Sequence, residues 1–335
     1  MNKSRKQLTG LLRLFPVPNS LSFSPVGIDI SHKVVRALRL KRTKDGLVPD
    51  TYKEIILEDA CDLLESTDDL DKCDALRLGL RKLKEELGLK FVSVSLPETK
   101  TYVFKTTLPV EALPTIEDAL NVKIQENVPL DVKDIVFDFD VQKDKLLPNG
   151  QMEVVVTVLP KKVIGAYTAL LKEEGMVPLS FESESQSIAR AVIKKGDNTS
   201  YLLINLGYTK VNLTIVEHGI VYYTSSIPYS SEDIVKDFNG KEAQVLKTKI
   251  NQLLIYWFTN KNDPENDEKI SNAILTGPFA SSPGMISFLE KSLRINVDTA
   301  NVWKNCFSLD EHVPVIGHKA SLRYGTAVGL SLIHK

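Results

Sequence analysis

A strand–turn–strand pattern occurs twice in this chain and constrains the fold more than any other feature of the sequence. The first copy joins the apolar runs Val26–Ile30 and Val34–Leu40, and the second joins Tyr201–Leu206 and Val211–Val216. In each copy only a short polar turn separates the two runs, as in a pair of antiparallel strands. The copies begin 175 positions apart, and this internal similarity predicts a duplicated fold with two related lobes.

The segments between the two copies alternate between strand and helix patterns. A third strand is expected in Thr51–Leu57, and leucines recur at helical spacing through Leu76–Leu87 before Gly88, a residue typical of a left-handed C-cap. Between Phe91 and Gly175 the pattern is that of a compact α+β unit. In this unit we expect strands at 92–96, 102–107, 135–142 and 152–159 and helices at 115–127 and 161–174.

The chain after the second copy continues the same α/β alternation. We expect a strand at 220–225, an amphipathic helix at 241–260, an exposed polar loop at 261–269, a strand at 273–276 and helices at 285–293 and 322–333. With 335 residues the chain is long enough for about two domains. Its 43% of hydrophobic residues are enough for a real core.

The charges nearly cancel over the whole chain but are distributed unevenly. The net charge is -1, which disfavours nucleic acid as a general partner. Residues 1–44 hold ten Lys and Arg and a single acid, Asp29, whereas residues 54–74 hold nine acids and a single base, Lys72. Two interpretations stay open: two solvated faces of one domain, or a docking or self-association feature.

The N-terminal segment is basic and has one apolar face. Leu8, Leu11, Leu12 and Phe15 recur at i, i+3, i+4 and i+7. A helix of this kind would contact an anionic membrane surface through residues 1–15, would bind a partner, or would be a mobile tail. Residues 16–20 read as a linker.

Cysteine usage and hydropathy indicate the cytoplasm. Cys61, Cys73 and Cys306 are an odd number without Cys-x-x-Cys spacing, so no disulfide framework is expected. No run of about 18 apolar residues exists, so we expect no membrane-spanning helix.

Two hairpin turns that face one another across a cleft present backbone N–H groups suited to phosphate. At this point the sequence resembles the actin-like ATPases. The segments that resemble their two phosphate loops, adenosine motif and closing helix are Val-Gly-Ile-Asp-Ile-Ser at 26–31, Asn-Leu-Gly-Tyr-Thr-Lys-Val-Asn-Leu-Thr-Ile-Val at 205–216, Ile-Leu-Thr-Gly at 274–277 and Tyr-Gly-Thr-Ala-Val-Gly-Leu at 324–330.

Within that superfamily the chain most resembles the PilM family of type IV pilus assembly proteins, with the FtsA family more distant. The resemblance extends from Ser22 to Leu332. The segments that carry it are Ser-Leu-Pro-Glu at 95–98, Ile-Gln-Glu-Asn-Val-Pro-Leu at 124–130, Leu-Leu-Lys-Glu-Glu-Gly-Met-Val-Pro at 170–178, Glu-Ser-Gln-Ser-Ile-Ala-Arg-Ala at 184–191 and Ser-Ile-Pro-Tyr at 226–229.

The resemblance implies an actin-like, ribonuclease H-like duplicated α/β fold with two lobes and an FtsA-like inserted α+β subdomain. The expected divisions are a basic amphipathic tail and linker at 1–21, the first lobe at 22–90 and 176–199, the inserted subdomain at 91–175, the second lobe at 200–315 with a peripheral helical part at 241–270, and a C-terminal helix at 316–335 that returns to the first lobe.

The resemblance also implies a site for ATP and Mg²⁺ between the two turns. The positions that match the family's nucleotide-binding loops are Asp29, Ser31, His32, Lys33, Asn205, Gly207, Tyr208, Thr209, Lys210, Gly277, Pro278 and Phe279. Asp29 would coordinate Mg²⁺ through water, or is part of a turn. Glu182 and Glu184 would polarise a water molecule, or are negative charges at a helix N-terminus.

Three of these loops depart from the family pattern. The segment 31–33 replaces a small Gly-rich turn, although Lys33 and a protonated His32 would attract phosphate. Asn205 replaces an acidic residue, and an amide is neither a base nor a strong ligand for Mg²⁺. The segment 277–279 replaces a glycine run and adds bulk. We therefore expect at most weak nucleotide binding and no efficient hydrolysis.

The function that the resemblance implies is that of a cytoplasmic scaffold or adaptor in a type IV pilus or competence pilus machine, peripheral at the inner face of the membrane. Its expected partners are the N-terminal tail of a PilN-like membrane protein, bound beside the inserted subdomain, and the assembly motor or platform. The alternatives are an active actin-like ATPase that hydrolyses ATP or polymerises in an FtsA-like way, and a cytoplasmic component of a type II secretion platform.

Overall fold

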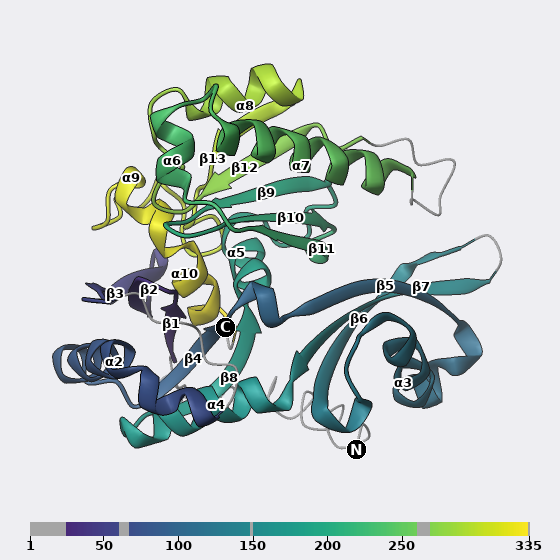
Figure 1. Ribbon diagram of the computed structural model, residues 1–335, viewed down its shortest axis with the longest axis horizontal. Helices are drawn as coiled ribbons and strands as arrows, with labels where there is room; N and C mark the ends of the chain where they lie inside the picture. The colour runs from purple at the N-terminus through teal and green to yellow at the C-terminus, as the bar shows by residue number, and fades with distance from the viewer. Residues whose placement is uncertain (1–24, 60–66, 148–149, 260–268, 334–335) are drawn as a thin grey trace.

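The computed structural model describes residues 25–59, 67–147, 150–259 and 269–333. These residues form two five-stranded sheets and one three-stranded sheet, with helices between and outside them (Figure 1). The two larger sheets define two lobes that lie one above the other, and the three-stranded sheet extends to one side.

The two five-stranded sheets share one topology, which confirms the predicted duplication. In the first sheet the order is β3 (Gly46–Ile56), β2 (Val34–Thr43), β1 (Val26–Ile30), β4 (Phe91–Leu96) and β8 (Val177–Ser183). In the second it is β11 (Ile220–Ile227), β10 (Val211–Glu217), β9 (Tyr201–Leu206), β12 (Asn272–Thr276) and β13 (Asn296–Thr299). In both sheets the first three strands are antiparallel and the last two are parallel to the central one.

Two helices lie between the sheets and approach each other closely. They are α5 (Glu184–Val192) and α10 (Gly325–Ser331), and Figure 1 shows both in the space between the lobes. A Cβ atom on Gly329 of α10 would lie 1.8 Å from the Ser187 carbonyl oxygen of α5, and one on Gly27 of β1 would lie 2.1 Å from the Ala327 oxygen. Only glycine permits these contacts, so the two glycines set how tightly α10 packs.

Other helices cover the outer faces of the two larger sheets. Their burial follows the leucine and valine pattern of the sequence: Leu76, Leu80 and Leu83 are fully buried in the core of the first lobe. Gly88 has φ 62° and its amide donates to the Lys84 oxygen, so the predicted C-cap is confirmed. These outer helices are α2 (Asp74–Leu87) and α4 (Lys161–Glu173) on the first lobe, and α6 (Ser231–Lys236), α7 (Lys241–Thr259) and α8 (Met285–Leu293) on the second.

The three-stranded sheet has its own core. It consists of β5 (Tyr102–Pro109), β7 (Gln151–Pro160) and β6 (Ile135–Leu146) in that order, all antiparallel, and α3 (Ile116–Asn127) covers one face. On that face Leu120 and Ile124 of α3 pack with valines of β7. On the opposite face the Lys105 ammonium group lies 5.8 Å from the ring centroid of Trp257 in α7, so this sheet also contacts the second lobe.

We expected the α+β unit to begin with the strand at 92–96 and to end with the helix at 161–174, but both elements belong to the first lobe. β4 pairs with β1 and β8 and is the second-last strand of the first sheet, and α4 buries Tyr167 and Leu170 in the core of the first lobe. β4 lies directly before β5 in the chain, but its nearly complete burial suits the interior of a parallel sheet. The inserted sheet therefore contains only β5, β6 and β7.

Several elements differ from the sequence prediction or were not predicted. The C-terminal helix predicted at 322–333 is shorter in the structure, where α10 covers Gly325–Ser331. Residues Leu322–Tyr324 form a 3₁₀ turn, and Tyr324 leaves the helical conformation at φ -101° and ψ 5°. The elements β8, β13 and α6 had no predicted counterpart. The short elements are α9 (His318–Ser321) and 3₁₀ turns at Thr67–Lys72, Glu98–Lys100, Val110–Thr115, Val132–Asp134 and Leu322–Tyr324.

Some predictions fall outside the described residues. These are the amphipathic tail, most of the polar loop at 261–269, and Cys61. Cys73 and Cys306 are buried and form no disulfide among the described residues, and burial raises the pKa of Cys306 to about 12. Across the described ranges no helix combines the length and apolar character needed to cross a membrane.

Candidate functional site

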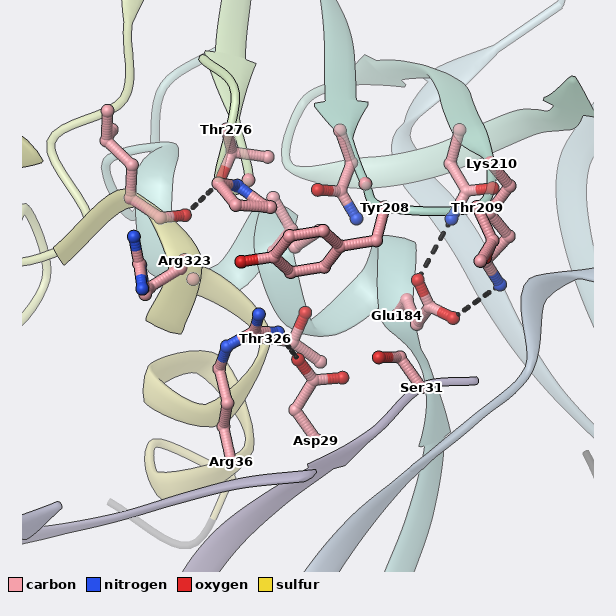
Figure 2. Close-up of a pocket in the computed structure, with 18 of the residues that line it drawn as sticks. Asp29, Ser31, Arg36, Glu184, Tyr208, Thr209, Lys210, Thr276, Arg323 and Thr326 are labelled. Atoms are coloured by element: carbon pink, nitrogen blue, oxygen red, sulfur yellow. Dashed lines mark hydrogen bonds and ion pairs between the residues drawn. The ribbon is translucent and has the colours of Figure 1, made fainter. Parts of the chain in front are cut away.

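The two hairpin turns meet at a cleft between the lobes. The cleft contains about 540 Å³ of empty space, its open mouth included. Its walls come from the end of β1, the first turn, the second turn, the start of α5, the end of β12 and the start of α10 (Figure 2). Both copies of the duplicated pattern thus contribute their turns to one site, as the sequence predicts.

Asp29 lies on β1 at the floor of the cleft and is nearly inaccessible to solvent. One carboxylate oxygen accepts from the Arg36 guanidinium at 3.2 Å, and the other accepts from the Ser95 hydroxyl at 3.3 Å. Burial raises the pKa of Asp29 to about 6; Arg36 lowers it and the nearby Glu184 raises it further. A strand residue with two partners is not a turn-former, so that interpretation of Asp29 was wrong.

Arg36 links Asp29 to a second carboxylate. Its Nε atom donates to Glu54 at 2.6 Å, and the other oxygen of Glu54 accepts from Arg323 at 2.9 Å. Burial lowers the pKa of Arg36, but the charges of Asp29 and Glu54 raise it by more, so Arg36 stays ionised. This chain of four charged groups connects β1, β2 and β3 to the segment that leads into α10.

A second ion pair connects the second turn to α5. The Lys210 ammonium group donates to one oxygen of Glu184 at 2.7 Å, and the Asn212 amide donates to the other at 2.9 Å (Figure 2). Burial lowers the pKa of Lys210, whereas the charge of Glu184 raises it, and the net direction is upward. Glu184 is the first residue of α5, where a negative charge is favoured.

A third buried carboxylate, Glu98, lies beside this pair. One oxygen accepts from the Ser185 amide at 3.0 Å, and the other has no hydrogen-bond partner among the described residues. Burial raises the pKa of Glu98, and the charge of Glu184 raises it further.

Tyr208 projects from the second turn into the cleft (Figure 2). Its ring meets that of Phe279 edge to face, with 5.4 Å between centroids. Gly277 adopts φ +93°, and a Cβ there would lie 2.6 Å from both the Asn205 Oδ1 atom and the Leu206 oxygen. The loop 277–279 therefore packs directly on the second hairpin.

Most of the nucleotide-binding positions named from the sequence come together here. Ten of the twelve line the cleft, and His32 and Phe279 do not. Glu184 also lines it, whereas Glu182 lies outside and binds Arg190 in an ion pair.

Several charged groups in and beside the cleft were not predicted from the sequence. Arg36 was a detectable signal, because it interrupts an apolar strand between Val35 and Ala37. Glu54 and Arg323 had no sequence signal, because sheet pairing places Glu54 beside Arg36 and the return of the C-terminal segment brings Arg323 to it. Glu98 lies in the Ser-Leu-Pro-Glu segment at 95–98, but nothing in that segment indicated its contact with the Ser185 amide.

Most of the positive charge that lines the cleft is neutralised by carboxylates of the protein. Of the four cationic side chains that line the cleft, three are bound to carboxylates of the protein, and the fourth is Lys33. No group of three or more His, Cys, Asp or Glu side chains within the described ranges is arranged to hold a metal ion.

Comparisons with known proteins agree with this architecture. In a PilM–PilN type IV pilus biogenesis complex, a chain that is 15% identical superimposes with a TM-score of 0.72 over 93% of this chain and 98% of that chain. Weaker similarity, with a TM-score of 0.47 and 11% identity, is found to MreB5 of Spiroplasma citri bound to AMPPNP, over 92% of this chain and 95% of that one. The cytoplasmic domain of EpsL, an inner membrane component of the type II secretion system of Vibrio cholerae, superimposes with a TM-score of 0.45 and 11% identity. The superposition covers 76% of this chain and 82% of that chain. No curated protein matches the chain in sequence.

The duplicated sheets, the helices between them and the interlobe cleft define an actin-like protein, and the first of these superpositions confirms the expected fold. A family model described as type IV pilus assembly protein PilM matches residues 27–240, more than half of the chain. The chain belongs to this family.

Proposed function

We propose that this protein is an adaptor of a type IV pilus assembly machine, which binds the N-terminal tail of a PilN-like membrane protein on the cytoplasmic side. By holding that tail it would couple the assembly motor or platform to the membrane complex. Membership of the PilM family supports the pilus context over a secretion platform. The solved complex whose chain superimposes over nearly the full length contains PilM together with PilN.

The observation that carries the proposal is the pair of sheet edges beside the inserted subdomain. β8 is the last strand of the first sheet and β6 is the last strand of the inserted sheet. An edge strand offers unpaired backbone groups to which an extended peptide can add. On β8, Val177 and Leu179 are each 43% exposed, so side-chain contacts are available beside the backbone.

The charges between these two edges specify the peptide further. Burial raises the pKa of Asp140 on β6, and the charge of Asp138 on the same strand raises it further. The charge of Arg190 lowers the pKa of Asp140 and that of Glu182 raises it, so these two residues of the first lobe lie near β6. We expect an extended tail with apolar side chains and at least one base.

Isothermal titration with a synthetic PilN-like N-terminal peptide tests the adaptor function. Leu179→Asp, on the β8 edge, should weaken binding by roughly tenfold or more, because a buried apolar contact is replaced by a charge. Ile255→Asp is the matched control, since Ile255 is 64% exposed on α7 and far from β8 in the fold. Equal affinity of the wild type and Leu179→Asp would exclude peptide addition at β8, and absence of wild-type binding would exclude the adaptor function.

We also propose that ATP and Mg²⁺ are not turned over in the cleft. Phosphate would have to displace Glu184 from Lys210, and Tyr208 projects into the same space. Asn205 supplies no carboxylate for Mg²⁺ or for a base. The ATPase alternative is supported by the small residues Gly207, Thr209 and Gly277, which still line the cleft.

A further inference from the structure

A second, smaller groove lies on the outer side of the first lobe, away from the interlobe cleft. It contains about 260 Å³ of empty space, its mouth included, and is formed by the end of β3 and one face of α2. Ile56 is 70% exposed and Leu78 is 47% exposed at its rim. The lining is mostly apolar: Ile55, Ile56, Leu57, Ala75, Leu78 and Gly79, together with Glu58 and Lys82.

The absence of a side chain at Gly79 brings α2 close to the strand. A Cβ atom there would lie 2.8 Å from the Cδ2 atom of Leu57. The sheet edge and the helix therefore form a continuous apolar surface next to exposed acids. Glu58 and Asp59 follow β3, and Asp74 lies one helical turn before Leu78, and all three are exposed.

We infer that this groove binds the N-terminal tail of the same chain. Residues 1–24 lie outside the described part and contain four bases, Lys3, Arg5, Lys6 and Arg13, and no acid. Their charge is thus opposite to that of Glu58, Asp59 and Asp74. The tail also carries an apolar set that would cover Ile56 and Leu78: Leu8, Leu11, Leu12 and Phe15.

The length of the tail permits this contact within one molecule. Gly27 of β1 is level with Leu38 and Tyr52 across the sheet, and Ile56 is four residues beyond Tyr52. That places the groove about 13 Å along the strands and about 10 Å across them from the start of β1. The ten residues from Phe15 to Pro25 can span about 30 Å when extended.

Docking would occupy the apolar face of the tail, so the same residues could not contact a membrane or another protein at the same time. The interaction pairs the basic N-terminal block with the acidic stretch that follows β3, and it gives a role to the uneven charge distribution. It does not depend on the adaptor function or on the interlobe cleft.

Limited trypsinolysis of the full-length protein tests the inference, with loss of residues 1–13 followed by intact-mass spectrometry. Cleavage after Arg13 should be slow in the wild type and about tenfold faster in Leu78→Asp, since cleavage follows the population of the undocked tail. Leu309→Asp is the matched control, because Leu309 is 50% exposed elsewhere on the surface. It should leave the rate unchanged.

A second variant distinguishes docking from a general effect on the fold. Leu12→Asp should accelerate cleavage as much as Leu78→Asp. The double variant should be cleaved little faster than either single variant, because both substitutions disrupt the same contact between the tail and the groove. Rapid wild-type cleavage, or a Leu78→Asp rate equal to that of the wild type, would overturn the inference. So would protection that grows with protein concentration, which indicates a second copy, or protection seen only with anionic phosphatidylserine vesicles, which indicates a membrane.

Discussion

The Lys210 ammonium group donates to the Glu184 carboxylate at 2.7 Å and so joins the turn of the second hairpin to the first residue of α5. The two side chains are only 12% and 5% exposed. The Lys210 ammonium group, which lines the cleft, is therefore bound by a carboxylate of the protein itself. The pair thus connects the second hairpin to the helix between the lobes, at the wall of the cleft.

Lys210→Met should destabilise the protein by about 3 kcal/mol, because it leaves the Glu184 carboxylate buried without its cation. Glu98 and Asp29 raise this penalty, since both are buried acids nearby. Urea unfolding measures the change. Lys236→Met removes an exposed ion pair and should leave the stability close to that of the wild type.

The double variant Lys210→Met/Glu184→Gln should lose less stability than the sum of the two single variants, because neither charge is then left alone. Full additivity would show that the ion pair is not a coupled unit.

Asp29→Asn should alter the pH dependence of stability in a defined window. Burial raises the pKa of Asp29 from its ordinary value of 3.8 to about 6, so the folded state holds a proton that the unfolded chain has released. The stabilisation from that proton is complete below about pH 3.8 and is lost as pH rises to about 6. The difference in unfolding free energy, wild type minus Asp29→Asn, should thus fall between pH 4 and 6 and stay level above. A difference that rises over this range would contradict the assignment.

Gly329→Ala should strongly destabilise the protein, because the new Cβ would lie 1.8 Å from the Ser187 oxygen and would force α5 and α10 apart. We expect a loss of about 3 kcal/mol, at the upper end for overpacking. A Cβ atom on Gly165 in α4 would meet open space at an exposed position. Gly165→Ala should therefore stabilise the protein by about 0.5 to 1 kcal/mol. Thermal unfolding of both variants provides the comparison.

Asn205→Asp combined with Tyr208→Ala should restore some affinity for Mg-ATP, because it returns a carboxylate and removes the ring from the cleft. Titration calorimetry measures the gain against the wild type. If affinity does not rise, the ion pairs at Arg36 and Lys210, and not the two eroded positions, close the cleft.

The sequence predicts the duplicated sheets well because both hairpins are short-range features: apolar runs, polar turns and a fixed order. It fails for β8, where Pro178 and alternating exposed residues weaken the strand pattern. The position of β4 could not be predicted either, since it depends on pairing Val92 with Val26, which only the tertiary fold brings together.

The same distinction applies to the site. Asp29 and Lys210 follow directly from the hairpin motifs, and both line the cleft. Their partners do not follow, because Glu54 and Arg323 meet only when the C-terminal segment returns to the first lobe. The sequence thus predicts where the cleft lies, but not that its charges neutralise one another.

Titration of the wild-type protein with Mg-ATP, with phosphate release followed in parallel, tests the account most directly. Because Lys210 and Arg36 are held by Glu184 and Asp29, we predict no micromolar binding and no phosphate release above background. Micromolar affinity together with measurable phosphate release would contradict the account and would establish the protein as an active ATPase.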